Sequence, residues 1–125
     1  MLIFKLNFGK MIVQKLKPSI GNVYEMAEKY YSVITALNNI NLTQRELQLV
    51  SFIASKGTII DSGVKKEFCE EFGTTSPTVT NMISKIKKMN IFVKKDGILK
   101  INPVLNVKFD EDLLLEIKFV TKDEH

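Results

Sequence analysis

The side chains best suited to bind another molecule lie at residues 76–89, in the stretch SPTVTNMISKIKKM. Apolar residues recur there at three- and four-residue spacing, which predicts a helix with one buried face. The apolar set is Val79, Met82, Ile83, Ile86 and Met89. The opposite face carries small hydrogen-bonding side chains and then cations, namely Thr78, Thr80, Asn81, Ser84, Lys85, Lys87 and Lys88. Recognition of DNA by a helix requires such a face, although any surface helix is polar on one side.

Two further features of this region favour an anionic partner. Ser76 is expected to cap the helix, because its hydroxyl can accept from a backbone N–H of the first turn, and Pro77 suits the next position. Six lysines lie within residues 85–100, at positions 85, 87, 88, 94, 95 and 100, against Asp96 alone. The formal net charge of the whole chain is +4. The lysines therefore concentrate where a nucleic-acid interface would lie.

Residue types that carry catalysis or bind metals are scarce. His125 is the only histidine and is terminal, so no nucleophile–base pair can be assembled around it. Asp110, Glu111 and Asp112 are consecutive and lack the spacing of a calcium loop, and no phosphate-binding glycine motif occurs. The single cysteine, Cys69, is interpreted as a small core residue, since a reactive thiol would need a cationic or basic partner. The sequence predicts no enzyme, no cofactor and no metal site.

Composition bounds the protein class. The chain has 125 residues, of which 45% are hydrophobic and 26% charged, as expected for one compact domain. The start, MLIFKLNFGK, is a poor signal peptide because Lys5, Asn7 and Lys10 interrupt its apolar run. No segment approaches the roughly 18 continuous apolar residues of a membrane span. A soluble cytoplasmic protein without a membrane partner is expected.

Residues 1–40 are predicted to contain a β-hairpin and a helix. Apolar residues alternate over 2–8, Gly9-Lys10 can turn the chain, and 11–17 can return as a second strand. Asn22 and Glu25 form a capping-box signal for a helix over about 20–38. Its apolar seam is Val23, Ala27, Tyr30, Ile34 and Leu37. Two interpretations stay open for this seam: packing on its own domain, or a dimer interface.

Residues 41–103 are predicted to form a winged helix-turn-helix. Thr43 and Glu46 make a capping box for a helix that Gly57 can end, and 58–60 is a short strand. A helix over 63–72, a turn at Gly73 and the helix from Ser76 make a helix-turn-helix. Residues 91–102 then form a hairpin around Asp96-Gly97, a pair typical of type I′ turns. The strand over 58–60 would pair with this hairpin.

Residues 104–125 are predicted to hold an acidic turn and a final strand. Asp110, Glu111 and Asp112 precede the apolar run LLLEIKFV at 113–120, which could pair with the N-terminal hairpin. The fold class is thus α+β: a winged helix-turn-helix with an added N-terminal hairpin and helix and a C-terminal strand.

Residues 43–103 resemble the winged-helix DNA-binding domains of MarR-like transcription regulators and of plasmid replication initiators of the RepL type. The resemblance lies in Ser-Pro-Thr-Val-Thr-Asn at 76–81, in Ile-Ser-Lys-Ile-Lys-Lys-Met at 83–89, and in the wing at 95–103. The second wing strand of the replication initiators likewise runs into Asn-Pro. The Ile/Asn/Lys-rich composition also looks like that of proteins from AT-rich phages or plasmids. The resemblance implies a fold and a DNA partner, and it covers about half the chain.

The first functional hypothesis is a duplex DNA-binding protein, either a transcription regulator or a replication-initiation protein. The helix at 76–89 would enter the major groove, and the wing would contact the flanking backbone or minor groove. The candidate DNA-binding residues are Ser76, Thr78, Thr80, Asn81, Ser84, Lys85, Lys87, Lys88, Lys94, Lys95 and Lys100.

The second hypothesis is a winged helix that acts as a protein-interaction or assembly module in a phage replication, transcription or virion complex. It is supported by the apolar terminal segments, which offer more strand-forming surface than a minimal DNA reader needs. The first hypothesis implies duplex DNA as the partner. A homodimer through the helix at 20–38 or through the terminal strands, and a protein partner, stay open.

Overall fold

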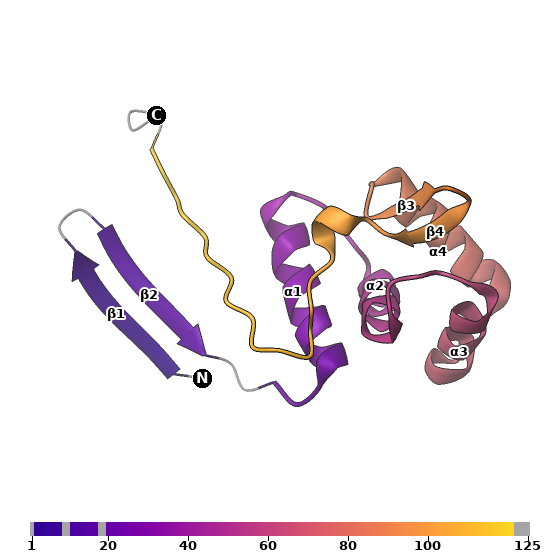
Figure 1. Ribbon diagram of the computed structural model, residues 1–125, viewed down its shortest axis with the longest axis horizontal. Helices are drawn as coiled ribbons and strands as arrows, with labels where there is room; N and C mark the ends of the chain where they lie inside the picture. The colour runs from indigo at the N-terminus through magenta and orange to yellow at the C-terminus, as the bar shows by residue number, and fades with distance from the viewer. Residues whose placement is uncertain (1, 9–10, 18–19, 122–125) are drawn as a thin grey trace.

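The computed structural model describes residues 2–8, 11–17 and 20–121 (Figure 1). Its elements are β1 (Leu2–Phe8), β2 (Met11–Lys17), α1 (Val23–Leu37), α2 (Gln44–Lys56), α3 (Ser62–Phe72), α4 (Ser76–Lys88), β3 (Phe92–Lys95), β4 (Ile98–Ile101) and the 3-10 turn η1 (Pro103–Leu105). The fold class is α+β, as the sequence predicted. The order of α2, α3, α4 and the β3–β4 hairpin is compatible with a winged helix-turn-helix.

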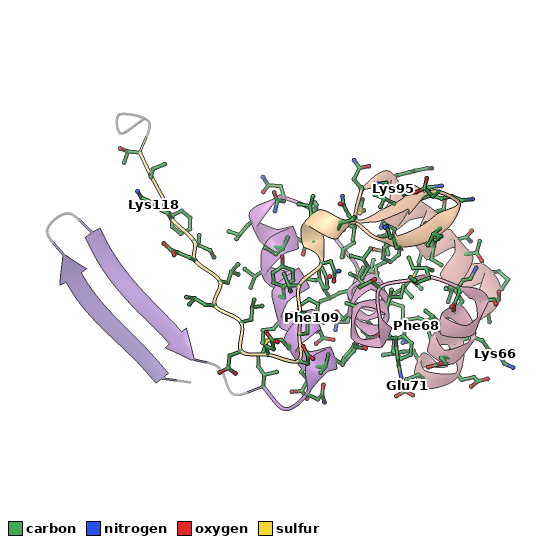
Figure 2. The ribbon with its side chains drawn as sticks, viewed as in Figure 1. Lys66, Phe68, Glu71, Lys95, Phe109 and Lys118 are labelled. Atoms are coloured by element: carbon green, nitrogen blue, oxygen red, sulfur yellow. The ribbon has the colours of Figure 1, made fainter. Side chains whose placement is uncertain are left out.

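The core lies where α2, α3, α4 and the β3–β4 hairpin meet. The residues that fill it are fully or almost fully buried: Leu49, Val50, Ile53, Phe68, Val79, Ile83, Ile86, Ile91, Phe92 and Ile101. Phe68 lies at its centre, with its ring centroid 4.5 Å from that of Phe72 and 5.6 Å from that of Phe52 (Figure 2). The predicted buried face of α4 is confirmed at Val79, Ile83 and Ile86. This face fixes which side of α4 meets solvent.

Local capping signals set most helix boundaries. The capping box of α2 is confirmed, because the Thr43 hydroxyl accepts from the Glu46 N–H at 3.1 Å and the Glu46 carboxylate accepts from the Thr43 N–H at 2.7 Å. Asp61 caps α3 by accepting from the Val64 N–H at 2.9 Å. Gly73 ends α3 in the left-handed conformation, with φ of 61°. The turn between α3 and α4 is therefore as short as the sequence predicted.

The start of α4 differs from the prediction. The N-cap is Thr75, with φ of −108° and ψ of 156°, so Ser76 is the first helical residue and Pro77 the second. No side chain caps this end. The prediction placed the cap one residue late because both Thr75 and Ser76 are good capping types, and proline is tolerated anywhere in the first turn, where its N–H is not needed.

The β3–β4 hairpin has the predicted turn. Asp96 and Gly97 have φ of 54° and 78°, as a type I′ turn requires, and Lys95 pairs with Ile98 on either side of it. The predicted strand over 58–60 is reduced to one bridge, between Ile59 and Lys100. Two backbone hydrogen bonds flank it, from the Ile60 N–H to the Leu99 carbonyl at 2.9 Å and from the Ile101 N–H to the Thr58 carbonyl at 3.0 Å. A longer strand is prevented because Thr58 has φ of 73°.

Helix α1 packs on α2 of the same chain. Its buried residues are Ala27, Tyr31 and Thr35, spaced four apart. The predicted seam is therefore partly wrong: Val23 is 36% exposed and Leu37 is 46% exposed. The difference arises because the chain after η1 also packs on α1 and draws Tyr31 inward. Burial raises the pKa of Tyr31, and its neutral hydroxyl donates to the Leu105 carbonyl at 3.0 Å.

The chain from η1 to Phe109 forms a strap along α1. Phe109 is 6% exposed, and its ring centroid lies 5.5 Å from that of Tyr30 and 5.7 Å from that of Tyr31. Figure 2 shows Phe109 next to α1. The strap also lies beside the C-terminal end of α2, because Lys56, Val107 and Phe109 line the same cavity.

The two terminal segments have different outcomes. The N-terminal hairpin is confirmed, with β1 and β2 antiparallel and with Leu2 opposite Lys17 and Phe8 opposite Met11. Its predicted turn at Gly9-Lys10 lies outside the described residues. The predicted strand at 113–120 is wrong: in the described structure this segment forms neither helix nor strand. Alternation of apolar residues is not enough for a strand, because a strand also needs a neighbour to complete its hydrogen bonds.

Candidate nucleic-acid interface

The exposed face of α4 is the best-formed candidate site. Because Val79, Ile83 and Ile86 are buried, the helical repeat places Pro77, Asn81, Ser84 and Lys88 on the opposite side, at intervals of three and four residues. Thr80 and Lys87 border this stripe on one side, and Thr78 and Lys85 border it on the other. All of these residues are exposed, and so is Ser76. The structure thus brings the predicted α4 residues together on one solvent-facing surface.

The first turn of α4 offers backbone donors. Helices α1, α2 and α3 have their first turns capped by Asn22, Thr43 and Asp61, whereas α4 has no side-chain cap. The Thr75 hydroxyl is instead hydrogen-bonded to the Thr78 hydroxyl, at 2.9 Å between the oxygens. The N–H groups of a first turn carry the positive end of the helix dipole. This end of α4 is therefore suited to a phosphate.

Lys85 makes a contact that the sequence did not predict. Its Nζ lies 2.9 Å from Oε2 and 3.1 Å from Oε1 of Glu46, whose side chain is only 4% exposed. Burial raises the pKa of Glu46, but the Thr43 N–H and the Lys85 ammonium outweigh it, so the pKa falls below its ordinary value. Lys85 therefore joins α4 to the first turn of α2. It positions the helix in addition to adding charge to its surface.

We expect Glu46→Gln to lower the free energy of unfolding by roughly 0.5–1 kcal/mol near neutral pH. Glutamine keeps an acceptor for the Thr43 N–H but loses the attraction to Lys85. Because folding lowers the pKa of Glu46, its contribution is complete above the ordinary value of 4.5 and is lost as pH falls through the lower folded value. The gap between wild type and variant should then close in acid, as measured by urea unfolding from pH 7 to pH 3.

Glu67→Gln is the matched control. It removes the ion pair Lys56–Glu67, in which the atoms are 3.5 Å apart and both side chains are about half exposed. An exposed pair of this kind contributes little at any pH. If both variants gave the same pH profile, Glu46 would have no special role in joining α2 to α4.

The predicted lysine cluster divides into three kinds. Lys87, Lys88, Lys94 and Lys95 are exposed, Lys85 is paired with Glu46, and the half-buried Lys100 lies at the bridge to Ile59. Lys94 and Lys95 are consecutive in β3, so they lie on opposite faces of the hairpin. Helix α4 packs against β3, and Figure 2 shows Lys95 on the β3–β4 hairpin. The four exposed lysines therefore form a cationic surface that spans α4 and both faces of the hairpin, and Asp96 is the only acid in these elements.

The surface of α3 has a different character. Glu67, Glu70 and Glu71 are all exposed on this helix, and Figure 2 shows Glu71 at its lower end, away from the β3–β4 hairpin. Cys69 is half-buried and packs against the core, in keeping with its interpretation as a small core residue. The cationic surface is thus confined to α4 and the hairpin.

Two residues of this interface escaped the sequence analysis. Thr75, and not Ser76, occupies the N-cap position of α4, although its side chain makes no capping hydrogen bond. Glu46 was recognised as part of a capping box, but nothing in the sequence indicated its ion pair with a lysine 39 residues away.

The chain was compared with known proteins. No family model matches it, and neither a curated protein nor a solved structure matches it. Among the helices that the structure describes, none is both long enough and apolar enough to cross a membrane. Interpretation of the site therefore rests on its geometry and charge.

Proposed function

We propose that this protein binds duplex DNA, with α4 in the major groove and the β3–β4 hairpin acting as a wing on the flanking backbone. The observation that carries the proposal is that a polar stripe on α4 lies next to a lysine-bearing hairpin. The outward stripe of α4 holds Asn81, Ser84 and Lys88, and the adjoining hairpin adds Lys94 and Lys95. A regulator of transcription or an initiator of replication, of phage or plasmid type, would use such a surface.

The chemistry of the stripe suits reading of bases. Helix α4 has 13 residues and is thus roughly 20 Å long, enough to lie along a major groove. Asn81, in its second turn, can donate to N7 and accept from N6 of adenine together, and Ser84 can bond to any base edge. Thr78 and Thr80 stand at the borders of the stripe, where they would meet sugar or phosphate.

The lysine charges would set the affinity for DNA and the position of the protein along the duplex. Lys87 and Lys88 lie at the last turn of α4, and Lys94 and Lys95 lie on the hairpin, so they would contact phosphates on either side of the groove. The uncapped first turn of α4 would hold one more phosphate through its N–H groups. Such contacts position the protein without carrying sequence information, which leaves specificity to Asn81 and Ser84.

A titration of wild-type protein against random and native genomic duplexes at several salt concentrations tests the proposal. Four lysine–phosphate contacts predict that log K falls with log salt with a slope of about −3 to −4. Asn81→Ala should keep this slope but reduce discrimination against one base pair by about 1–3 kcal/mol. Asn106→Ala, which removes an exposed amide far from α4 in the sequence, should change neither quantity. Binding without salt dependence would overturn the proposal.

The second candidate function is a winged-helix assembly module. It is favoured by the exposed apolar side chains of the C-terminal segment, where Leu114 is 89% exposed and Phe119 is 87% exposed. An assembly module should co-purify with another protein and bind duplex DNA weakly at all salt concentrations. The same titration therefore separates the two functions.

A further inference from the structure

Residues 113–120 are an extended segment in which every apolar side chain after Leu113 is exposed. Leu114 and Phe119 are almost fully exposed, and Leu115, Ile117 and Val120 are 39%, 44% and 44% exposed. Figure 1 shows the segment leaving the strap and running away from α1. An exposed apolar run with strand-like alternation is a template for pairing with another strand.

The N-terminal hairpin offers the complementary edge. In the part of the chain that the structure describes, β1 and β2 form a two-stranded sheet, so each strand has a partner on one side only. Each strand has seven residues, close to the eight residues of the 113–120 segment. Figure 1 shows the hairpin and the segment on the same side of α1, away from α3, α4 and the β3–β4 hairpin. Pairing there would leave the candidate DNA interface free.

The charges of the two segments are opposite. Residues 2–17 contain four lysines and no acid, which gives a formal charge of +4. Residues 110–120 contain four acids (Asp110, Glu111, Asp112, Glu116) and one lysine (Lys118), which gives a formal charge of −3. Antiparallel pairing with β2 would bring Asp112 next to Lys17. Parallel pairing would place the acids at the other end of β2, so the charges favour the antiparallel arrangement.

This arrangement also continues one apolar face. With Leu113 opposite Lys17, Ile117 lies opposite Val13 and Phe119 opposite Met11. The observed register of the hairpin already pairs Val13 with Leu6 and Met11 with Phe8. Two apolar rows would then cross the three strands. Leu6, Val13 and Ile117 form one row, and Phe8, Met11 and Phe119 form the other. A register shifted by one residue would break both rows.

We propose that residues 113–120 pair as an antiparallel strand with β2 of a second copy of this chain. In the described part of a single chain the two segments are not paired with each other, so the exposed apolar residues are left for another molecule to cover. A second copy supplies the matching edge, length and charge. Each copy both donates a segment and receives one, which makes a closed two-fold dimer with two three-stranded sheets.

The oligomeric state of the full chain, measured without DNA, tests this proposal independently of the proposed function. Sedimentation across a range of concentrations should show a dimer for the wild type. Phe119→Glu should halve the mass, and so should Val13→Glu. Phe119 is 87% exposed in the single chain, so its replacement should leave the helical circular dichroism and melting temperature of the monomer intact.

Two control variants locate the interface. Val104→Glu changes a residue that is 85% exposed outside the segment, and Leu37→Glu changes an exposed apolar residue of α1. Both should remain dimeric. A monomeric wild type, a dimer that survives Phe119→Glu, or loss of the dimer only in Leu37→Glu would overturn the proposal; the last result would assign the interface to α1.

Discussion

Replacing Lys87, Lys88, Lys94 and Lys95 together by alanine should lower the affinity for duplex DNA by about 10,000-fold at 50 mM salt and flatten the salt slope by about 3–4 units. The physical reason is release of condensed counterions, because each lysine that meets a phosphate displaces about one cation from the DNA. All duplexes should be affected nearly alike, since phosphate contacts do not read sequence. Fluorescence anisotropy at 50–200 mM salt measures both quantities.

The control for this variant removes the same charge elsewhere. Lys29, Lys66, Lys108 and Lys118 are exposed and lie outside α4 and the β3–β4 hairpin, and Figure 2 shows Lys66 and Lys118 far from Lys95. Their joint replacement by alanine lowers the net charge equally, so it should reduce only long-range attraction and change the slope little. If both quadruple variants weakened binding to the same degree, the lysines of α4 and the hairpin would act only through the total charge of the protein.

Phe109→Ala should destabilise the protein by about 3–5 kcal/mol, the usual cost of deleting a buried aromatic ring. For a chain of this length the melting temperature should fall by roughly 10–20 °C. The ring is 6% exposed and packs on Tyr30 and Tyr31, so its loss opens a cavity between the strap and α1. The hydrogen bond from Tyr31 to the Leu105 carbonyl should weaken with it. Differential scanning calorimetry measures the change.

Val104→Ala is the control for the strap. Val104 lies in η1 but is 85% exposed, so its truncation should change stability by less than about 0.5 kcal/mol. Equal melting temperatures for the Phe109 and Val104 variants would mean that the strap does not pack on α1 in solution. At a temperature where it stays folded, the Phe109 variant should still bind DNA, because α4 and the hairpin are built on the other side of α2 (Figure 1).

The strap also shows why the candidate site was easier to predict than its surroundings. The exposed face of α4 follows from a repeat within 13 residues, and the turn of the hairpin follows from Asp96-Gly97. Both depend on contacts between near neighbours. The burial of Phe109 depends on where the chain runs after η1, and composition around that residue gives no sign of it.

The sequence by itself determined the elements whose signals are local. The capping box of Thr43 and Glu46, the cap at Asp61 and the left-handed Gly73 each involve residues within four positions, so the chemistry of the side chains alone selects the conformation. The amphipathic pattern of α4 is local in the same sense. From these features the fold class and the candidate interface can be predicted before any tertiary contact is known.

Only the tertiary structure decided the contacts between distant parts of the chain. The ion pair from Lys85 to Glu46 spans 39 residues, and the hydrogen bond from Tyr31 to Leu105 spans 74. The segment at 113–120 carries a strand pattern, yet it forms no strand, because pairing needs an adjacent edge as well as an alternating sequence. A local pattern indicates which conformation a segment can adopt. Whether its backbone groups form hydrogen bonds and its apolar side chains are buried depends on which other parts of the chain lie next to it in space.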